Sequence, residues 1–216
     1  YKFKINDDGS LKYNNKTKEE GSTINQFSLD EYQNNLRVAL SGNEGSRIVI
    51  FDENLKKIGS TEYLSKGERM YSTRFLGNKA YMVTYKNTDP LYAIDLSIPT
   101  SPKVLGELKI PGYSTYLHPY DENHLIGIGM ETKEKVYRDS FGKVKRTTAI
   151  ITGMKMALFD VSDINNPIQI SKTVIGDSRT TSAILTNHKA LLFSKEKGLL
   201  AIPVNKYESD YYYKKI

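Results

Sequence analysis

A repeated unit of about 43 residues is the feature that most constrains the fold of this chain. Three stretches place an aspartate directly after an apolar run: "RIVIFDENLKKIGS", "PLYAIDLSIPTSPKVLGELK" and "MKMALFDVSDINNPIQISKT". Asp52 and Asp95 are 43 residues apart, whereas Asp95 and Asp160 are 65 residues apart. A polar insertion over residues 131–152 accounts for the excess. The fold must therefore be assembled from copies of one unit.

A turn asparagine followed by an apolar run marks the same period. It occurs four times, at Asn35, Asn78, Asn123 and Asn187, with spacings of 43, 45 and 64 residues. Asparagine tolerates the left-handed backbone conformation, so it suits the tight turn of a β-hairpin. The two landmarks agree on where each copy begins.

Each copy of the unit predicts four short strands. In the second copy we expect strands at 70–76, 80–85, 91–96 and 103–109. The second of these is almost wholly apolar, as a strand buried on both faces should be. Four strands with a period in the forties are typical of a β-propeller blade, in which neighbouring blades cover each other's apolar faces. We therefore predict an all-β fold, a β-propeller of about four four-stranded blades.

The repeat predicts that the whole chain, residues 1–216, is a single propeller segment made of several blades. The predicted blades are 22–66, 67–110, 111–175 and 176–216, with 1–21 as the last strand of a preceding blade and 131–152 as an inserted hairpin. A closed four-bladed ring is one arrangement. Because the chain begins within a unit, we favour part of a larger ring, whose open blade faces would allow self-association.

Composition narrows the classes of function. The chain has no cysteine, which excludes disulfides and thiol chemistry. Its net charge of +6 attracts polyanions, although a lysine-rich solvated surface would give the same composition. Since no apolar run reaches the roughly 18 residues of a membrane span, we predict no membrane insertion.

Several long strings resemble a known family. They are "NQFSLDEYQNNLRVA", "GERMYSTRFLGNKAYMVTYKNTDPLYAIDLSIPTSPKVLGELKIPGYSTYLHPYDENHLIGIG" and "LFDVSDINNPIQIS". They are similar to secreted bacterial and archaeal proteins with a C-terminal β-propeller domain, distantly related to WD-repeat proteins. The resemblance runs from about Gly21 to Val204. It implies a larger parent that is secreted or at the cell surface, and it implies no activity and no catalytic residues.

The insertion is the sharpest local signal. "ETKEKVYRDSFGKVKRTTAIITG" alternates on both sides of "DSFGK", which predicts a β-hairpin with Gly142 at the turn. Six basic against three acidic side chains leave the insertion at +3, half the charge of the chain. In a propeller this connection lies on the same face as the loops that lead into each first strand, one of which holds Tyr113.

Basic and aromatic side chains on a protruding arm suit an anionic partner or a neighbouring subunit. The candidate binding residues are Tyr113, Lys133, Lys135, Arg138, Phe141, Lys143, Lys145 and Arg146. We expect a protein or an anionic cell-surface polymer as partner. An extended hairpin without a partner is the alternative. We do not expect nucleic acid, which would require a continuous basic stripe with exposed aromatics.

Two polar clusters raise the question of metal binding. "HPYDENH" holds His118, Asp121 and His124 within seven residues. However, His124 occupies the same place in the repeat as Lys79 and His188, which favours a solvated hairpin tip.

The second cluster, "DVSDINNP", offers the oxygens of Asp160, Ser162, Asp163, Asn165 and Asn166, as a calcium loop would. Asx-turn chemistry explains the same residues without an ion. We predict no metal and no cofactor.

An enzyme is the alternative to a binding module. Some propellers are glycosidases that use carboxylate pairs or a tyrosine nucleophile with arginine support. First strands line the central channel, which places Arg37, Arg69, Arg74, Tyr71 and Tyr116 near candidate positions. Tyrosines packed between blades and locally paired arginines would explain the same residues. We expect a non-enzymatic binding or scaffold module, with a glycan-active enzyme as the alternative.

Overall fold

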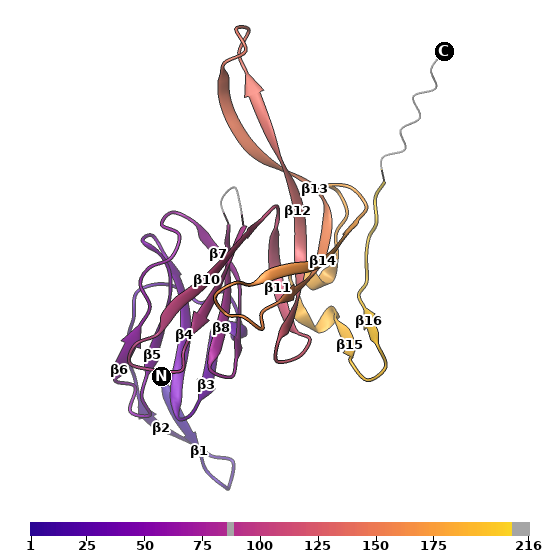
Figure 1. The fold of residues 1–216 in the computed structure, drawn as a ribbon. Coiled ribbons are helices and arrows are strands. Elements are labelled where there is room, and N and C mark those ends of the chain that lie inside the picture. The colour runs from indigo at the N-terminus through magenta and orange to yellow at the C-terminus, as the bar shows by residue number, and fades with distance from the viewer. Residues whose placement is uncertain (86–88, 209–216) are drawn as a thin grey trace.

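The computed structural model describes residues 1–85 and 89–208, which form β-sheets standing side by side (Figure 1). Three sheets have four antiparallel strands each. The first contains β3 (Leu29–Tyr32), β4 (Asn35–Gly42), β5 (Gly45–Phe51) and β6 (Lys57–Ser60). The second contains β7 (Arg69–Leu76), β8 (Lys79–Tyr85), β9 (Asp89–Asp95) and β10 (Lys103–Ile110). The third contains β11 (Tyr113–Pro119), β12 (His124–Arg138), β13 (Val144–Asp160) and β14 (Ile168–Ile175).

The prediction of an all-β propeller is confirmed. Within each four-stranded sheet the strands follow chain order, as in a propeller blade. The first strands β7 and β11 lie against each other, and a short 3-10 helix, η1 (Gln26–Ser28), packs beside β7. The first strands of the second and third sheets therefore meet at their inner edges.

Alternation along β8 explains why that strand is almost wholly apolar. Ala80 and Met82 pack with Ile48 of the first sheet. Tyr81 and Val83 point the other way and pack with Leu125 and other residues of the third sheet. Because each middle strand is covered on both faces, every blade depends on its neighbours for burial, at roughly 25 cal/mol for each Å² of apolar surface removed from water.

The N-terminal segment differs from the prediction. The sequence predicts a single strand within 1–21, whereas the structure has two, β1 (Lys2–Ile5) and β2 (Leu11–Asn15), paired as an antiparallel hairpin. The reason is a turn at "NDDG": Gly9 adopts φ +81° and its N–H donates to the carbonyl of Asn6 over 2.9 Å. The hairpin lies beside the first sheet (Figure 1), where Asn15 donates to the carbonyl of Asn54.

The C-terminal segment also differs from a four-stranded blade. Its described part holds two 3-10 helices, η2 (Ala183–Leu185) and η3 (His188–Ala190), and two short paired strands, β15 (Leu192–Ser194) and β16 (Leu199–Ala201). The side chains of Ser182 and Asn187 accept hydrogen bonds from backbone N–H groups two residues on, which favours helical turns there. Residues 209–216 of the predicted blade lie outside the described residues.

No helix in the described ranges is both long enough and apolar enough to cross a membrane.

Candidate functional site

The residues of the insertion form an arm that projects beyond the sheets (Figure 1). Strands β12 and β13 pair continuously from His124↔Asp160 to Arg138↔Val144. Their lower parts belong to the third sheet, where β12 also pairs with β11 and β13 with β14. Beyond Glu131 each strand pairs only with the other, which leaves a two-stranded ribbon with both faces open. We call residues 132–151 the arm.

A hydrogen-bonded turn closes the arm. One carboxylate oxygen of Asp139 accepts the backbone N–H groups of Phe141 and Lys143, each over 3.0 Å. Gly142 adopts φ +79°, a conformation that favours glycine, and its N–H donates to the carbonyl of Asp139. The turn presents Phe141 at the tip with 94% of its surface exposed.

The register separates the side chains of the arm into two faces, because successive residues of a strand point to opposite sides. The pairs Lys135↔Thr148 and Tyr137↔Arg146 belong to one face. We call it the basic face; it consists of Lys133, Lys135, Tyr137, Arg146, Thr148 and Ile150. We call the other the apolar face; it consists of Glu134, Val136, Arg138, Val144, Thr147, Ala149 and Ile151.

Tyr137 holds two cations of the basic face beside its ring. The Lys135 ammonium lies 5.1 Å from the ring centroid, and the Arg146 guanidinium carbon lies 4.7 Å from it. Such contacts contribute about 0.5–1 kcal/mol each at exposed sites. The ring therefore restrains two like charges that would otherwise move apart.

The positive charge of the arm is available to a partner. Within the described part of the chain, none of its six basic side chains forms an ion pair. At the root, the Glu131 carboxylate is already paired with Lys172 over 2.6 Å. Asp139 is engaged by the turn. The other carboxylate of the arm, Glu134, lies on the apolar face, so the cations of the basic face have no carboxylate beside them on that face.

A buried polar cluster fixes the root of the arm to the sheet. Glu131 is buried and bonded to Lys172, and Lys155, fully buried, donates to the carbonyl of Pro111 over 2.8 Å. Pro111 leads through Gly112 into β11. The first contact ties the start of the arm to β14, and the second ties β13 to the linker between the second and third sheets.

The predicted site residue Tyr113 lies on the same face of the propeller as the arm, at the start of β11. Its ring centroid is 4.7 Å from that of Tyr71 and 4.6 Å from that of Tyr85. Burial raises the pKa of Tyr113, and the neighbouring Tyr71 and Tyr85 hydroxyls raise it by a smaller amount. The three rings form a half-buried cluster between the second and third sheets, so Tyr113 serves packing as well as the surface.

The other predicted residues do not all share one surface. Lys133, Lys135 and Arg146 lie on the basic face, whereas Arg138 points to the apolar face. Phe141 and Lys143 belong to the tip, and Lys145 occupies an irregularity in the pairing between Tyr137 and Arg138. The structure therefore concentrates three of the predicted cations on one side.

Of the five residues considered for a channel site, Arg74 and Tyr116 meet. The Arg74 guanidinium lies 3.8 Å from the ring centroid of Phe27 and 5.4 Å from that of Tyr116. Arg74 also donates to the carbonyl of Leu117 over 2.8 Å, and burial lowers its pKa. The Tyr116 hydroxyl lies 3.1 Å from Nδ1 of His118. Arg74 is thus packed against the aromatic rings of Phe27 and Tyr116.

The remaining three residues lie elsewhere. Arg37 is buried, forms an ion pair with Asp30 and donates to the carbonyl of Gly77 over 2.6 Å. Tyr71 packs in the tyrosine cluster, and Arg69 is exposed. These five side chains do not converge on one point.

The two clusters considered for metal binding have other roles. His124 and Lys195 both contact Asp121, over 2.8 Å each, whereas His118 is bonded to Tyr116. The hydrogen bond from Lys195 has the largest effect in holding the pKa of Asp121 well below its usual range. Hydrogen bonds from the Asn123 backbone and the His124 ring act in the same direction. Across residues 1–85 and 89–208, no three His, Cys, Asp or Glu residues are grouped as a metal ion would require.

The residues of "DVSDINNP" form Asx turns. Asp160 accepts the backbone N–H of Ser162, and Asp163 accepts that of Asn165, over 2.9 Å each. These bonds use the carboxylates that a calcium loop would direct inward.

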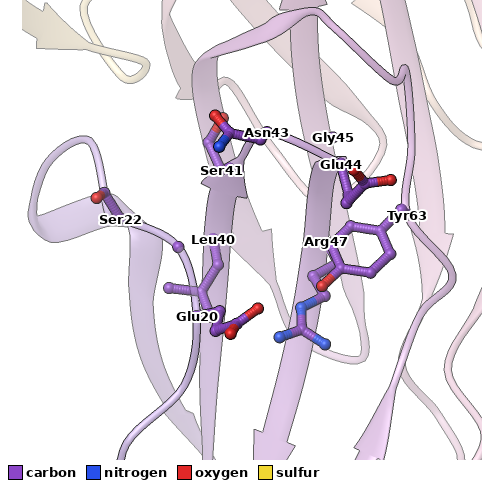
Figure 2. Close-up of a pocket in the computed structure, with 11 residues that line it drawn as sticks. Glu20, Ser22, Leu40, Ser41, Asn43, Glu44, Gly45, Arg47 and Tyr63 are labelled. Carbon is purple, nitrogen blue, oxygen red and sulfur yellow. The ribbon is translucent and has the colours of Figure 1, made fainter.

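A pocket that the sequence did not reveal lies where β4 turns into β5 (Figure 2). Its cavity volume is about 510 Å³. The lining residues are Glu20, Gly21, Ser22, Leu40, Ser41, Gly42, Asn43, Glu44, Gly45, Arg47 and Tyr63. On this face of the sheet, the cross-strand pair Gly42↔Gly45 follows the pair Leu40↔Arg47. Because neither glycine has a side chain, the space next to Leu40 and Arg47 stays open and forms the cavity. The only sequence signal is these two glycines around the turn.

The charge of this pocket does not suit an anion. The Arg47 guanidinium stacks 4.8 Å from the Tyr63 ring centroid and is already bonded to Glu19 over 2.8 Å. Figure 2 shows the carboxylates of Glu20 and Glu44 in the same lining. Glu44 is paired with Lys66 over 2.7 Å, so within the described residues Glu20 is the charged side chain of the lining that has no ion-pair partner. The pocket therefore lacks the unpaired cations that the arm presents.

The fold and the arm together define a β-propeller domain with one elaborated face. The chain belongs to the Beta propeller domain family, which it matches over residues 1–216. An uncharacterized protein of Methanocaldococcus jannaschii is 46% identical over 162 residues, which cover 72% of this chain and 23% of the relative. An uncharacterized protein of Archaeoglobus fulgidus is 36% identical over 184 residues, which cover 85% of this chain and 26% of the relative. The chain thus spans about a quarter of the length of these curated relatives.

Proposed function

We propose that this domain is a non-enzymatic binding module of a larger secreted or cell-surface protein, and that it recognises an anionic cell-surface polymer through the face that bears the arm. The observation that carries the proposal is the basic face, where Lys133, Lys135 and Arg146 lie together without carboxylate partners. The resemblance to secreted propeller proteins distantly related to WD-repeat proteins supports the location.

The geometry of the basic face favours a linear polymer over a compact anion. Residues two apart on a strand are separated by roughly 6.8 Å, so Lys133 and Lys135 present charges at a regular spacing. Charges with that repeat can contact successive acidic groups along a chain. The cavity of about 420 Å³ beside Lys133 is also lined by the carboxylates of Glu131 and Glu134, so it does not suit a compact anion. The cavity of Figure 2 is lined by Glu20 and Glu44 and lies apart from the basic face.

Binding of this kind should depend strongly on ionic strength. Each exposed contact contributes little, about 1 kcal/mol or less, and is screened over roughly 8–10 Å at physiological salt. Affinity must therefore come from several contacts made together, which the ribbon supplies by holding Lys133, Lys135 and Arg146 on one face.

The test uses the 216-residue chain and a polygalacturonate or heparin column as the anionic probe. One variant replaces residues 132–151 with a short Asn-Gly turn. A second carries Lys133→Glu, Lys135→Glu and Arg146→Glu. The matched control carries Lys4→Glu, Lys12→Glu and Lys103→Glu, which gives the same change in net charge on other sheets.

We expect the first two variants to elute from the anionic column at a much lower salt concentration than the control variant. Equal losses in the control would mean that net charge alone governs retention, and the proposed role of the arm would be rejected. Hydrolysis of a glycan panel that Tyr71→Phe abolishes would instead favour a glycan-active enzyme.

A further inference from the structure

The apolar face of the arm has no partner in the described chain. Val136, Val144 and Ile151 are 44%, 47% and 38% exposed, and they lie on the same side of a ribbon that pairs with nothing else. A lone two-stranded ribbon has marginal stability in water, and gains it when an apolar face is covered.

The charges on this face follow a symmetric pattern. Along β12 the side chains read Glu134, Val136, Arg138, with opposite charges at equal distances from a central valine. Neither charge forms an ion pair within residues 1–85 and 89–208. Arg138 donates a hydrogen bond to the carbonyl of Gly142, over 3.0 Å, at the edge of the turn. Such a pattern is complementary to itself when it is reversed.

We propose that the arms of two copies of this chain pack apolar face to apolar face, antiparallel, around a two-fold axis at Val136. In this arrangement Val136 meets Val136 of the second copy, and Glu134 meets Arg138 of the second copy at both ends. The cross-strand pairs Glu134↔Ala149 and Arg138↔Val144 then place Val144 opposite Ala149 of the second copy. Each contact occurs twice, as a two-fold interface requires.

The charges select the antiparallel arrangement. A two-fold packing of the same faces with the arms parallel would set β12 of one copy on β13 of the other. Glu134 would then face Ala149, Arg138 would face Val144, and neither charge would meet its opposite. The antiparallel packing also keeps the two basic faces on the outside of the four-stranded layer. The dimer would thus present two basic faces to the solvent, which suits simultaneous contact with a polymer.

The size of the arm limits the affinity. Two ribbons of this length bury less than the roughly 1,200 Å² of total surface typical of stable interfaces, which places the contact among weak ones. We therefore expect a reversible dimer with a dissociation constant of roughly micromolar order. The dimer does not depend on whether an anionic polymer is bound.

The experiment is sedimentation velocity on the 216-residue chain over a concentration series that spans the micromolar range. Val136→Lys should leave the chain monomeric, because it places two ammonium groups at the centre of the interface. Glu134→Arg and Arg138→Glu should each weaken association by about tenfold or more. Combining Glu134→Arg with Arg138→Glu restores the pairing in reverse, so the double variant should dimerise like the original chain.

Lys135→Glu is the control on the opposite face and should leave dimerisation unchanged. Circular dichroism of each variant shows whether the fold is kept. A monomer at every concentration overturns the proposal, as does association that persists in Val136→Lys, which would point to the open blade faces. Failure of the double variant to recover overturns the pairing of Glu134 with Arg138. Retention on the anionic column tests the basic face separately, so the two proposals fail independently.

Discussion

Gly59 in β6 lies directly beneath the backbone carbonyl of Pro99. A Cβ atom at Gly59 would lie 2.1 Å from that oxygen and 3.2 Å from Cδ of Pro102. The same contact recurs one blade on, where a Cβ at Gly106 would lie 2.3 Å from the carbonyl oxygen of Ile164. In the second and third blades, the loop between the third and fourth strands thus rests on a glycine of the blade before it.

This relationship predicts that Gly59→Ala and Gly106→Ala destabilise the domain. The added methyl group meets backbone, which cannot turn aside, so adjoining blades must separate locally. We expect a loss of about 1–3 kcal/mol in the free energy of unfolding for each. Urea denaturation measures the loss.

Gly42→Ala is the matched control, because the nearest atom to a Cβ there is Cα of Gly21 at 3.8 Å, an ordinary contact. Equal stability of all three variants would show that the loops shift at no cost, and would refute the role of these glycines.

The buried ion pair at the root of the arm predicts an asymmetry. The Glu131 side chain is 9% exposed and that of Lys172 is 33% exposed. Lys172→Met leaves a buried carboxylate without its partner, whereas Glu131→Gln leaves an ammonium that can reach water. Removing one partner of a buried pair costs about 3–5 kcal/mol at most, so we expect Lys172→Met to approach that range and Glu131→Gln to cost clearly less.

Thermal or urea unfolding of the two variants, together with the double variant, measures the asymmetry. The reverse order of stabilities would mean that the carboxylate is solvated through other contacts, and that the pair does not fix the arm.

The sequence predicts the parts of this fold that repeat, because repetition reports on packing that every copy shares. The strands predicted in the second copy agree with β7 to β10 within two residues at each end. The loop that contacts Gly59 contains Pro102, and the equivalent loop one blade on contains Pro167. In the sequence this contact shows only as a proline seven residues after Asp95 and again after Asp160. It becomes a contact between blades only when the blades are side by side.

Prediction from the sequence fails for segments that do not repeat the unit. The two strands of 1–21 depend on a local turn at Gly9, and the 3-10 helices near Ser182 and Asn187 depend on side-chain hydrogen bonds to the backbone. At the candidate site, alternation fixes which cations share a face, but the position of Lys145 depends on an irregular pairing near the turn. The pocket of Figure 2 joins Glu20, Arg47 and Tyr63 from three separate segments, which no local pattern reports.

The ring of Tyr137 should affect binding through the cations beside it. In Tyr137→Leu the ribbon keeps an apolar side chain, but Lys135 and Arg146 lose the contacts that restrain them. We expect retention on the anionic column to fall to a salt concentration between that of the original chain and that of the triple charge reversal. The two cation–π contacts together are worth about 1–2 kcal/mol, which sets the size of the effect. Unchanged retention would show that the cations need no restraint.

Tyr81 predicts how stability changes at alkaline pH. The side chain is fully buried between the second and third sheets, and its hydroxyl has no hydrogen-bond partner among the residues that the structure describes. Burial raises the pKa of Tyr81 to about 12, above the ordinary value of 10.0. Below pH 10 both folded and unfolded chains keep the proton. As the pH rises from about 10 towards 12, only the unfolded chain releases it, so the free energy of unfolding falls across this window.

Tyr81→Phe has no such proton, and it also removes a buried hydroxyl that lacks a partner among the described residues. The variant should therefore be as stable as the original chain, or more stable by about 1 kcal/mol, near pH 7. Urea denaturation of both proteins at pH 7 and between pH 10 and 12 checks both effects. A Tyr81→Phe variant that loses stability at pH 7 would mean that the hydroxyl has a bound water, and a variant with the same alkaline decline would assign the titration to other tyrosines.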